Sequence, residues 1–367
     1  MSDPRWNQAR NLLCIRLDQL GDVLMCTPAM RALKQAVPGR RITLMSSGSG
    51  GAVARFVPEV DELIEYASPW MKISRPHDLS VDLAMVETLR ARGFDAAVIF
   101  TTYSQSPLPA ALFCYLAGIP LRLAHCHENP YQLLSDWVPD PEPQQRVRHE
   151  VQRQLDLVAT VGAHADDDRL SFRVPAEDMA WMRRQLQELG IGEGTRWIVL
   201  HPGATAASRR YPPRQWREVA KELERRFGCP LVFTGDAGEA ALVDEIRTGL
   251  NHACSFAGRL DLGRLAALIK LAPLMISNNT GPAHMAAALG TPLVDLYALT
   301  NPQHTPWRVP NRVLYQDVPC RYCYKSVCPQ GHHHCLTQVA PVRVADAAEA
   351  LLQAQPEGHR DTLVLPF

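Results

Sequence analysis

Leu274-Met275-Ile276, followed by Ser277-Asn278-Asn279-Thr280-Gly281-Pro282-Ala283-His284, is the stretch of sequence that decides the fold. The apolar residues at its start predict a short buried strand. The segment after it, Met285 to Leu289, favours a helix that ends at Gly290. Pro282 stands where a first-turn proline belongs, because that position needs no N–H donor. The stretch therefore predicts a strand, a tight turn and the start of a helix.

The turn between this strand and this helix is a candidate anion site. Asn279 or Thr280 can cap the helix, and Gly281 has no side chain to keep a ligand from the backbone. Free N–H groups and the helix dipole both favour phosphate at such a place. An ordinary α/β turn explains the same spacing, and a lone histidine such as His284 is more often structural than chemical. Spacing alone leaves both interpretations open.

The composition indicates a globular protein that is long enough for two domains. The chain has 367 residues, and its 38 Lys and Arg balance its 38 Asp and Glu. A net charge of zero gives no electrostatic argument for a nucleic-acid partner. No apolar run reaches the roughly 18 residues of a membrane span, and no signal-peptide core follows the first ten residues. We therefore expect a cytoplasmic protein.

Short apolar runs alternate with helical patterns along the chain, which predicts parallel sheets with helices on both faces. The predicted strands are 11–15, 41–45, 62–66, 96–100 and 121–124 in the first half, and 197–200, 231–234, 274–276 and 293–296 in the second. A segment rich in proline, 129–148, reads as a surface loop. We expect two doubly wound domains with a boundary between Gly162 and Gly194, and a site at the carboxyl ends of their strands, in the cleft between them.

The loop after the first strand carries a candidate carboxylate. Asp22 follows Gly21 at the start of a helix, where a carboxylate serves either as a cap or as a general base in the cleft. A helix N-terminus lowers the pKa of a carboxylate and so weakens it as a base. The loop lacks the full G-x-G-x-x-G pattern, so a dinucleotide fingerprint is not supported.

Two loops of the second half carry further candidates. The basic cluster of Arg209, Arg210 and Arg214 lies near Gly203 and suits a phosphate or diphosphate, although a solvated basic surface explains it equally well. In the next loop, Asp236 or Glu239 can accept hydrogen bonds from ribose hydroxyls, and helix capping is the alternative.

Cysteines gather near the end of the chain, at Cys320, Cys323, Cys328 and Cys335, with three histidines among them. These ligand types can hold a structural zinc ion, but the spacing is not that of a standard zinc finger. A reduced, packed loop and disulfides are the other interpretations. Ten cysteines in a chain of this length do not suggest a disulfide scaffold.

Taken together, these motifs resemble those of the heptosyltransferases, glycosyltransferase family 9. The segment 16–23 resembles the N-terminal signature of that family, and His201-Pro202-Gly203-Ala204 followed by Arg210-Tyr211-Pro212 is similar to the loop before its lysine-tryptophan-proline motif. Thr234-Gly235 with Glu239 is similar to its next loop, and the opening stretch with 286–292 resembles its donor motif. The matches follow one another in the family's order over most of the chain.

The resemblance implies a GT-B fold, in which two Rossmann-like doubly wound domains face one another across a cleft. Residues 1–170 would form the acceptor side and residues 171–345 the nucleotide-sugar side. The last segment, 346–367, belongs to a helix and tail that would cross back to the first domain. The implied activity is inverting sugar transfer from a nucleotide sugar, with no cofactor and no catalytic metal.

The resemblance also implies roles for single residues. Asp22 matches the base that deprotonates the acceptor, and Arg210 falls where the family has a lysine that stabilises the leaving diphosphate. The implied donor-binding residues are Gly21, Gly203, Glu239, Asn279, Thr280, Gly281 and His284.

Two departures from the family pattern stand out. Asn279 replaces an aspartate, which removes a negative charge, and Arg210-Tyr211 replaces lysine-tryptophan, which keeps the charge but changes the geometry. The acidic run Asp166 to Asp168 lies in the presumed linker and reads as a solvated loop. Metal-independent transfer therefore fits the sequence better.

The resemblance favours ADP-heptose as the donor and the inner core of lipopolysaccharide as the acceptor. A lipid-linked acceptor requires peripheral contact with the inner membrane, and the irregular stretch with Trp70, Met71, Lys72, Arg75 and Pro76 is a candidate for it, against the simpler interpretation of a surface loop. A GT-B sugar-nucleotide epimerase and a non-catalytic sugar-nucleotide or glycan-binding protein are the alternatives. Detection of a transferred sugar separates the first, and the presence of Asp22 argues against the second.

Overall fold

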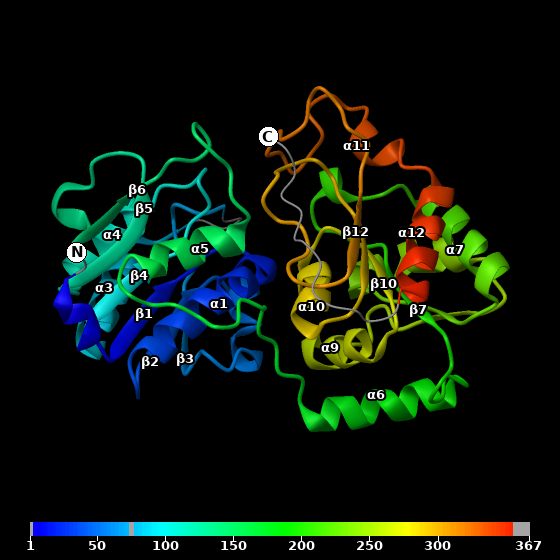
Figure 1. Cartoon of the computed structure of the whole chain (residues 1–367), viewed down its shortest axis with the longest axis horizontal. Coiled ribbons are helices and arrows are strands. Elements are labelled where there is room, and N and C mark those ends of the chain that lie inside the picture. Colours follow the sequence, from blue (N-terminus) through cyan, green and yellow to red (C-terminus); the bar gives the residue numbers. More distant parts are fainter. Residues whose placement is uncertain (1–2, 73–76, 355–367) are drawn as a thin grey trace. The chain divides into compact units, whose positions relative to one another are not determined.

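The computed structural model describes residues 3–72 and 77–354, and the chain divides into two compact units, the first ending at Ser171 and the second beginning at Phe172 (Figure 1). Each unit contains one parallel sheet with helices packed on it. Arg75 and Pro76, and residues 355–367 of the expected tail, lie outside the described residues.

The first sheet has six parallel strands in the order β3-β2-β1-β4-β5-β6. This is the order of a doubly wound Rossmann-like sheet, in which the direction of winding reverses between β1 and β4. The strands are β1 (Asn11–Ile15), β2 (Arg41–Ser46), β3 (Glu62–Glu65), β4 (Ala96–Ile99), β5 (Leu121–Cys126) and β6 (Asp136–Pro139). The helices are α1 (Leu20–Ala36), α2 (Gly48–Gly51), α3 (Leu79–Arg92), α4 (Leu108–Leu116) and α5 (Glu150–Ala159).

The second sheet repeats this topology, in the order β12-β11-β10-β7-β8-β9, with its reversal between β7 and β10. Its strands are β7 (Ile198–His201), β8 (Leu231–Phe233), β9 (Ala253–Ser255), β10 (Met275–Asn278), β11 (Leu293–Leu296) and β12 (Asn311–Leu314). The helices are α6 (Ala176–Glu188), α7 (Pro213–Phe227), α8 (Ala240–Arg247), α9 (Leu262–Leu271), α10 (Gly281–Leu289), α11 (His334–Thr337) and α12 (Pro341–Gln353).

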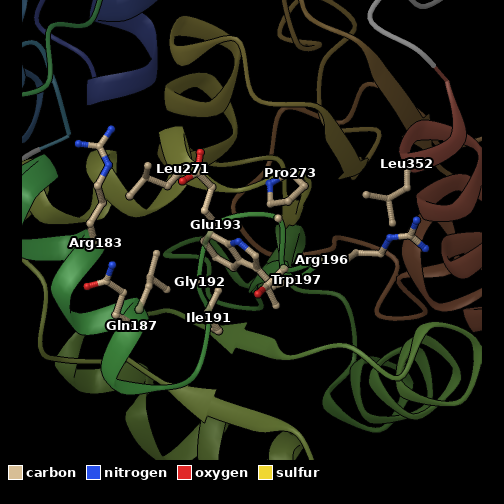
Figure 2. Close-up of a pocket in the computed structure, with 13 residues that line it drawn as sticks. Arg183, Gln187, Ile191, Gly192, Glu193, Arg196, Trp197, Leu271, Pro273 and Leu352 are labelled. Atoms are coloured by element: carbon tan, nitrogen blue, oxygen red, sulfur yellow. The ribbon is translucent and has the colours of Figure 1, made fainter.

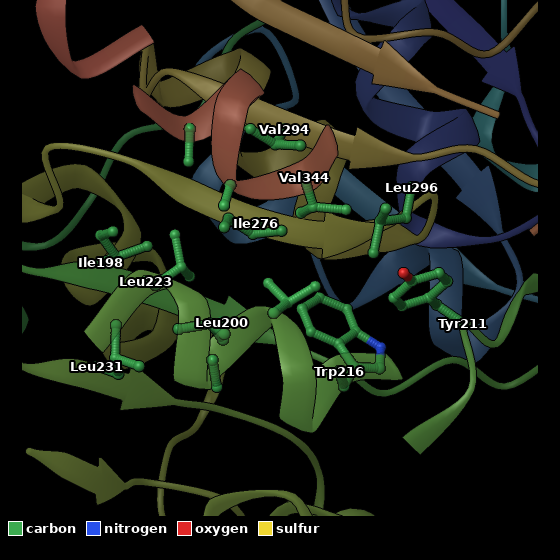
Figure 3. Packing of buried hydrophobic residues seen from close by; sticks show 14 of the residues in the cluster. Ile198, Leu200, Tyr211, Trp216, Leu223, Leu231, Ile276, Val294, Leu296 and Val344 are labelled. Atoms are coloured by element: carbon green, nitrogen blue, oxygen red, sulfur yellow. The ribbon is translucent and has the colours of Figure 1, made fainter. Parts of the chain in front are cut away.

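Each unit has its own hydrophobic core. In the first unit, Leu13 and Ile15 of β1 point to the face that α3 and α4 cover, because alternate residues of a strand point to opposite faces. In the second unit, Ile198 and Leu200 of β7 pack against Trp216 of α7 and against α8 and α12 (Figure 3). The central strands are buried on both faces, which explains why they appear in the sequence as continuous apolar runs.

Three strands escape the sequence prediction, and all three are at sheet edges. β6 lies within the segment expected to be a loop, and β9 and β12 are short and only half-buried. An edge strand needs no apolar residues on its exposed side, so its sequence carries little strand signal. The Gly/Ser segment after β2 contains the helical turn α2, which the side chain of Ser47 caps.

The last helix belongs to the second unit. α12 packs against α7, β11 and β12, and its residues Val344, Ala348 and Leu351 join the second core. The expectation that the chain crosses back to the first domain at this end remains a prediction. Among the residues that the structure describes, no helix is both long enough and apolar enough to span a bilayer.

Candidate functional site

Most of the candidate residues lie on the loops or helix starts at the two topological switch points, and Glu239 follows the neighbouring strand β8. In a doubly wound sheet the loops that leave the two strands at the reversal diverge to opposite faces, which opens a crevice at the carboxyl edge. In the first unit, these loops follow β1 and β4. In the second unit, they follow β7 and β10, and they contain Gly203 and Thr280.

Arg16, directly after β1, is the centre of the polar site in the first unit. It is fully buried, and each of its three guanidinium nitrogens faces a different carboxylate. Nε lies 2.9 Å from Asp18, Nη1 lies 2.7 Å from Glu150, and Nη2 lies 3.3 Å from Asp22. Because a buried charge must be paired, these carboxylates are what allows an arginine at this place.

Asp22 occupies the third position of α1. One carboxylate oxygen accepts a hydrogen bond from the backbone N–H of Gln19 in a capping box, and the other faces Arg16. Its side chain is 18% exposed, whereas that of Glu150 is fully buried. The capping interpretation and the functional one are therefore compatible, since the capped carboxylate still reaches the surface. Gly21, beside it, is buried in the first turn.

The loop that carries Asp18 is held in place from two sides. Gln105, after β4, donates to the Asp18 carboxylate over 2.7 Å, and the hydroxyl of Ser47 donates to the Asp18 carbonyl over 2.6 Å. A Cβ at Gly50 would lie 2.6 Å from that carbonyl, so only glycine fits there. Burial raises the pKa of Asp18, and the nearby Arg16 charge opposes this effect.

In the second unit, Asn278 at the end of β10 fastens the loop that follows β7. Its side-chain amide donates to the carbonyls of Pro202 and Gly203, at 2.8 and 3.3 Å, and its oxygen accepts from the N–H of Tyr211 at 3.1 Å. Asn278 is fully buried. The loop that carries Arg210 is thus tied at both ends to the strand before the anion-site turn.

Glu239 lies directly over Gly203. A Cβ on Gly203 would meet the Glu239 carboxylate at 2.0 Å, so a side chain there would displace it. The carboxylate accepts from the N–H of Asp236 at 2.9 Å. Burial raises the pKa of Glu239, and its backbone hydrogen bonds oppose the rise. The structure therefore brings together Gly203 and Glu239, two of the candidate donor-binding residues.

Arg210 is exposed on the same loop. Its Nε donates to the carbonyl of Ala204 over 2.7 Å, which holds the guanidinium beside the loop backbone. Its charge lowers the pKa of Glu239 in part, so the two side chains are electrostatic neighbours. Tyr211 is buried instead and donates to the carbonyl of Val339 at 2.7 Å. Arg210 is thus the member of this pair that a ligand can meet.

The side chain of Asn279 points into the protein. Its amide donates to Asp295 of β11 at 3.0 Å and to the carbonyl of His304 at 2.9 Å. Asp295 is fully buried, and burial raises its pKa to about 7. A carboxylate is therefore present next to position 279, but it comes from the neighbouring strand. This contact gives the side chain of Asn279 a structural partner in place of a ligand.

The other residues of the donor motif form the start of α10. Thr280 is the N-cap residue, but its hydroxyl donates to the carbonyl of Asn278 at 3.2 Å and does not cap the helix N–H groups. Gly281 is the first helical residue and is half-buried. His284 is buried, and its ring lies 6.4 Å from that of His304, centroid to centroid. The first-turn N–H groups therefore receive no side-chain cap from Thr280.

The four clustered cysteines line one small void of about 20 Å³, together with His332 and His333. All four are reduced, and Cys320 Sγ lies 3.8 Å from His332 Nε2. Within residues 3–72 and 77–354, no group of three or more His, Cys, Asp or Glu side chains is arranged to hold a metal ion. The structure thus shows a packed, reduced cysteine loop, which was one of the three interpretations of the sequence.

A pocket of about 810 Å³ lies elsewhere in the second unit (Figure 2). Its lining includes Trp197 and Pro273, which precede β7 and β10, and Leu352 at the end of α12. It therefore lies at the amino ends of the strands, away from the carboxyl-edge loops. Volume alone does not identify the site in this fold, because the loops that bind ligands are at the opposite edge.

Two Rossmann-like units, each with polar loops at its switch point, have the architecture of the GT-B fold. The family model of glycosyltransferase family 9 (heptosyltransferase) matches residues 83–334, which is the greater part of the chain. The chain belongs to glycosyltransferase family 9.

The individual relatives are distant but match over almost their whole length. Lipopolysaccharide heptosyltransferase 2 of Escherichia coli K12 is 27% identical over 358 residues, which cover 93% of this chain and 98% of the relative. A solved structure of E. coli ADP-heptose LPS heptosyltransferase II has a TM-score of 0.71 at 25% identity, with 93% and 98% coverage. The crystal structure of a family 9 glycosyl transferase from Veillonella parvula has a TM-score of 0.78 at 22% identity and covers 94% and 97%, which shows the shared fold.

Sequence reasoning singled out Asp22, Gly203 and Glu239 but missed their supports. Arg16 and Asp18 lie in the segment 16–23, but the resemblance implies no role for either, and no motif points to Glu150 or Asn278 as site residues. A charged residue inside an apolar strand end, such as Arg16, is the signal that could have pointed to a buried ion-pair cluster. Nothing in the sequence links Glu150 to Arg16, because the two residues meet only in the folded chain.

Proposed function

We propose that this enzyme transfers a heptose from ADP-heptose to the core of lipopolysaccharide, with inversion and without a catalytic metal. The observation that carries the proposal is the pair of switch-point sites in a family 9 chain. One presents a partly exposed carboxylate, Asp22, and the other presents the exposed Arg210 and a helix start that the Thr280 side chain does not cap. The descriptions of the E. coli relatives, which name ADP-heptose and lipopolysaccharide, support the donor and the acceptor.

In the proposed reaction Asp22 acts as the general base. The acceptor hydroxyl gives its proton to the Asp22 carboxylate, and its oxygen forms a bond to the anomeric carbon of the donor. The bond from that carbon to the diphosphate oxygen breaks, and its electron pair leaves with the nucleoside diphosphate. Attack opposite the leaving group inverts the anomeric centre.

The residues of the second unit are proposed to bind the leaving nucleoside diphosphate. Arg210 and the N–H groups at the start of α10, near Gly281, supply positive charge where the diphosphate develops negative charge. Glu239, held over Gly203, is suited to accept hydrogen bonds from the ribose hydroxyls. Arg210 and the helix start can together neutralise the negative charge of the leaving diphosphate, so this step needs no magnesium ion.

We further propose peripheral contact between the first unit and the inner membrane, because the acceptor is lipid-linked. Large apolar side chains are exposed on two neighbouring helices, Leu79 and Leu83 on α3 and Leu116 on α4. Trp70, a candidate from the sequence, instead packs its ring on Phe113, with ring centroids 4.9 Å apart. The exposed α3–α4 face, defined by these three leucines, is thus the better candidate for lipid contact.

Thermal shift and transfer assays test the donor site. ADP without magnesium should stabilise the protein more than UDP, GDP or dTDP do. Arg210→Ala should weaken ADP binding about tenfold or more, because a charge-assisted hydrogen bond contributes roughly 1.5–3 kcal/mol. Arg225→Ala, an exposed arginine at the far end of α7, is the matched control and should bind normally.

Stabilisation that requires magnesium would refute metal-independent binding, and a preference for another nucleotide would refute the ADP donor. Failure of the wild-type protein to transfer heptose from ADP-heptose to a heptose-deficient lipopolysaccharide core would refute the activity.

A further inference from the structure

The buried cluster around Arg16 contains more negative charge than Arg16 can neutralise. One guanidinium faces three carboxylates, and the one that it approaches most closely, Glu150 at 2.7 Å, is the only one that is fully buried. Burial of a carboxylate is costly, and although Glu150 gives Nη1 its partner, a single positive charge needs only one carboxylate to neutralise it. The pairing with Arg16 therefore leaves the cluster with a surplus of negative charge, and Glu150 is its most deeply buried part.

Glu150 enters the cluster from the start of α5, the helix that packs against α1. Besides Arg16 Nη1, its Oε1 accepts from Gln154 Nε2 at 2.8 Å. Its Oε2 is buried with no hydrogen-bond partner among the described residues. The closest contact of Arg16 is thus with the fully buried Glu150, whereas its contact with Asp22 is the longest of the three.

We propose that Glu150 is a positioning residue for Asp22: it holds the Arg16 guanidinium and offsets its charge, so that the Asp22 carboxylate remains a competent base. This inference rests on the proposed role of Asp22. A base that formed a tight, isolated ion pair with an arginine would give up much of its proton affinity. A base that shares the arginine with two other carboxylates keeps that affinity.

The other groups around Asp22 do not take over this role. Cys26, one turn along α1, is a buried thiol whose Sγ donates to the Asp22 carbonyl at 3.3 Å, and burial raises its pKa well above the usual value, so it stays neutral. His149 caps α5 through its ring, and Arg153 faces Glu150 from the same helix. Asp18, on the loop after β1, is the remaining carboxylate on Arg16, and it offsets the Arg16 charge in the same way.

The test is the pH profile of transfer by Glu150→Gln. The amide has the same shape as the carboxylate and its oxygen can still accept hydrogen bonds from Arg16 and Gln154, but the negative charge is removed. The pKa of Asp22 should then fall, because the Arg16 charge is less offset. The acid limb of kcat/KM should move to lower pH by about one unit, the order of shift produced by a single nearby charge. The plateau should fall, because a weaker base is less effective.

Glu142→Gln is the matched control. Glu142 is also fully buried and also bound to arginines, with Arg148 and Arg153 each at 2.7 Å, but it is not a partner of Arg16. It should lose stability as Glu150→Gln does while leaving the acid limb where the wild type has it. If Glu150→Gln lowers stability and leaves the acid limb unmoved, the positioning role is overturned.

A second variant keeps the inference testable if Glu150→Gln does not fold. Asp18→Asn removes a different carboxylate from the same guanidinium and should shift the acid limb in the same direction; no shift would overturn the inference. Asp22→Asn separates this result from a failure of the proposed function. Full activity in Asp22→Asn would refute the base itself, whereas its loss together with an unshifted Glu150→Gln profile would refute only the positioning role.

Discussion

At the scale of a residue, Asp295 is a buried carboxyl group that contacts Asn279, one of the candidate donor-binding residues. The carboxyl is fully buried in β11, and burial raises its pKa to about 7, with the Asn279 amide as its hydrogen-bond donor. The nearby Arg209 charge lowers the pKa only in part. Asn279 therefore acts here as a neutral donor to a group that is close to its titration point at neutral pH.

We predict a pH-dependent stability difference between the wild type and Asp295→Asn. The folded pKa lies above the ordinary value of 3.8, so the folded state holds a proton that the unfolded state has lost. The free energy of unfolding of the wild type should fall between about pH 4 and pH 7, by up to about 1.4 kcal/mol per pH unit. Above pH 7 it should level off.

Chemical denaturation at several pH values measures this difference. The asparagine of Asp295→Asn does not titrate. The free energy of unfolding of this variant should therefore rise relative to that of the wild type as pH increases across the same window. Asp317→Asn, at an exposed carboxylate, is the control and should follow the wild type. Parallel curves for the wild type and Asp295→Asn would contradict the assignment.

At the scale of an element, the loop after β7 depends on the end of β10. The parallel pairing of these two strands places Asn278 beside Pro202, and one side chain then satisfies three backbone groups of the loop. Strand register thus determines where Arg210 is presented. A strand end, and not the loop's own sequence, holds this part of the candidate site.

We predict that Asn278→Ala destabilises the protein by about 3 kcal/mol, because it leaves buried backbone groups without partners. Nucleotide binding should weaken as well, since the Arg210 loop loses its attachment. Urea denaturation and an ADP titration measure the two effects. Asn251→Ala, in an exposed turn, should change stability by less than about 0.5 kcal/mol; an equal effect of the two variants would count against the anchoring role.

At the scale of the whole molecule, the exposed α3–α4 face is the proposed place of membrane contact. The combined change Leu79→Ser, Leu83→Ser and Leu116→Ser should lower the fraction bound in vesicle flotation several-fold, because each buried methylene contributes about 0.8 kcal/mol. Transfer to a soluble acceptor should be unaffected. Leu189→Ser with Val342→Ser, at exposed apolar positions of the second unit, is the matched control. Equal flotation of all variants would show that this face does not bind the membrane.

Much of the architecture could be predicted because it depends on local chemistry. Central strands such as β1 and β11 are buried on both faces, so their apolar runs reveal them. The helix α10 ends at Gly290 as predicted, and Gly290 adopts the left-handed conformation. The edge strands β6, β9 and β12 were missed because water covers part of each, and no apolar pattern is required of them.

By itself, the sequence determined the α/β alternation, the order of the motifs and the candidate residues Asp22, Gly203 and Glu239, because each of these depends on residues close together along the chain. Only the tertiary structure decided their partners. Glu150 reaches Arg16, and Asp295 reaches Asn279, because helices and strands distant in sequence pack together and bury these charges. Burial and the pairing it demands belong to the folded chain, so no local pattern of residues could have shown them.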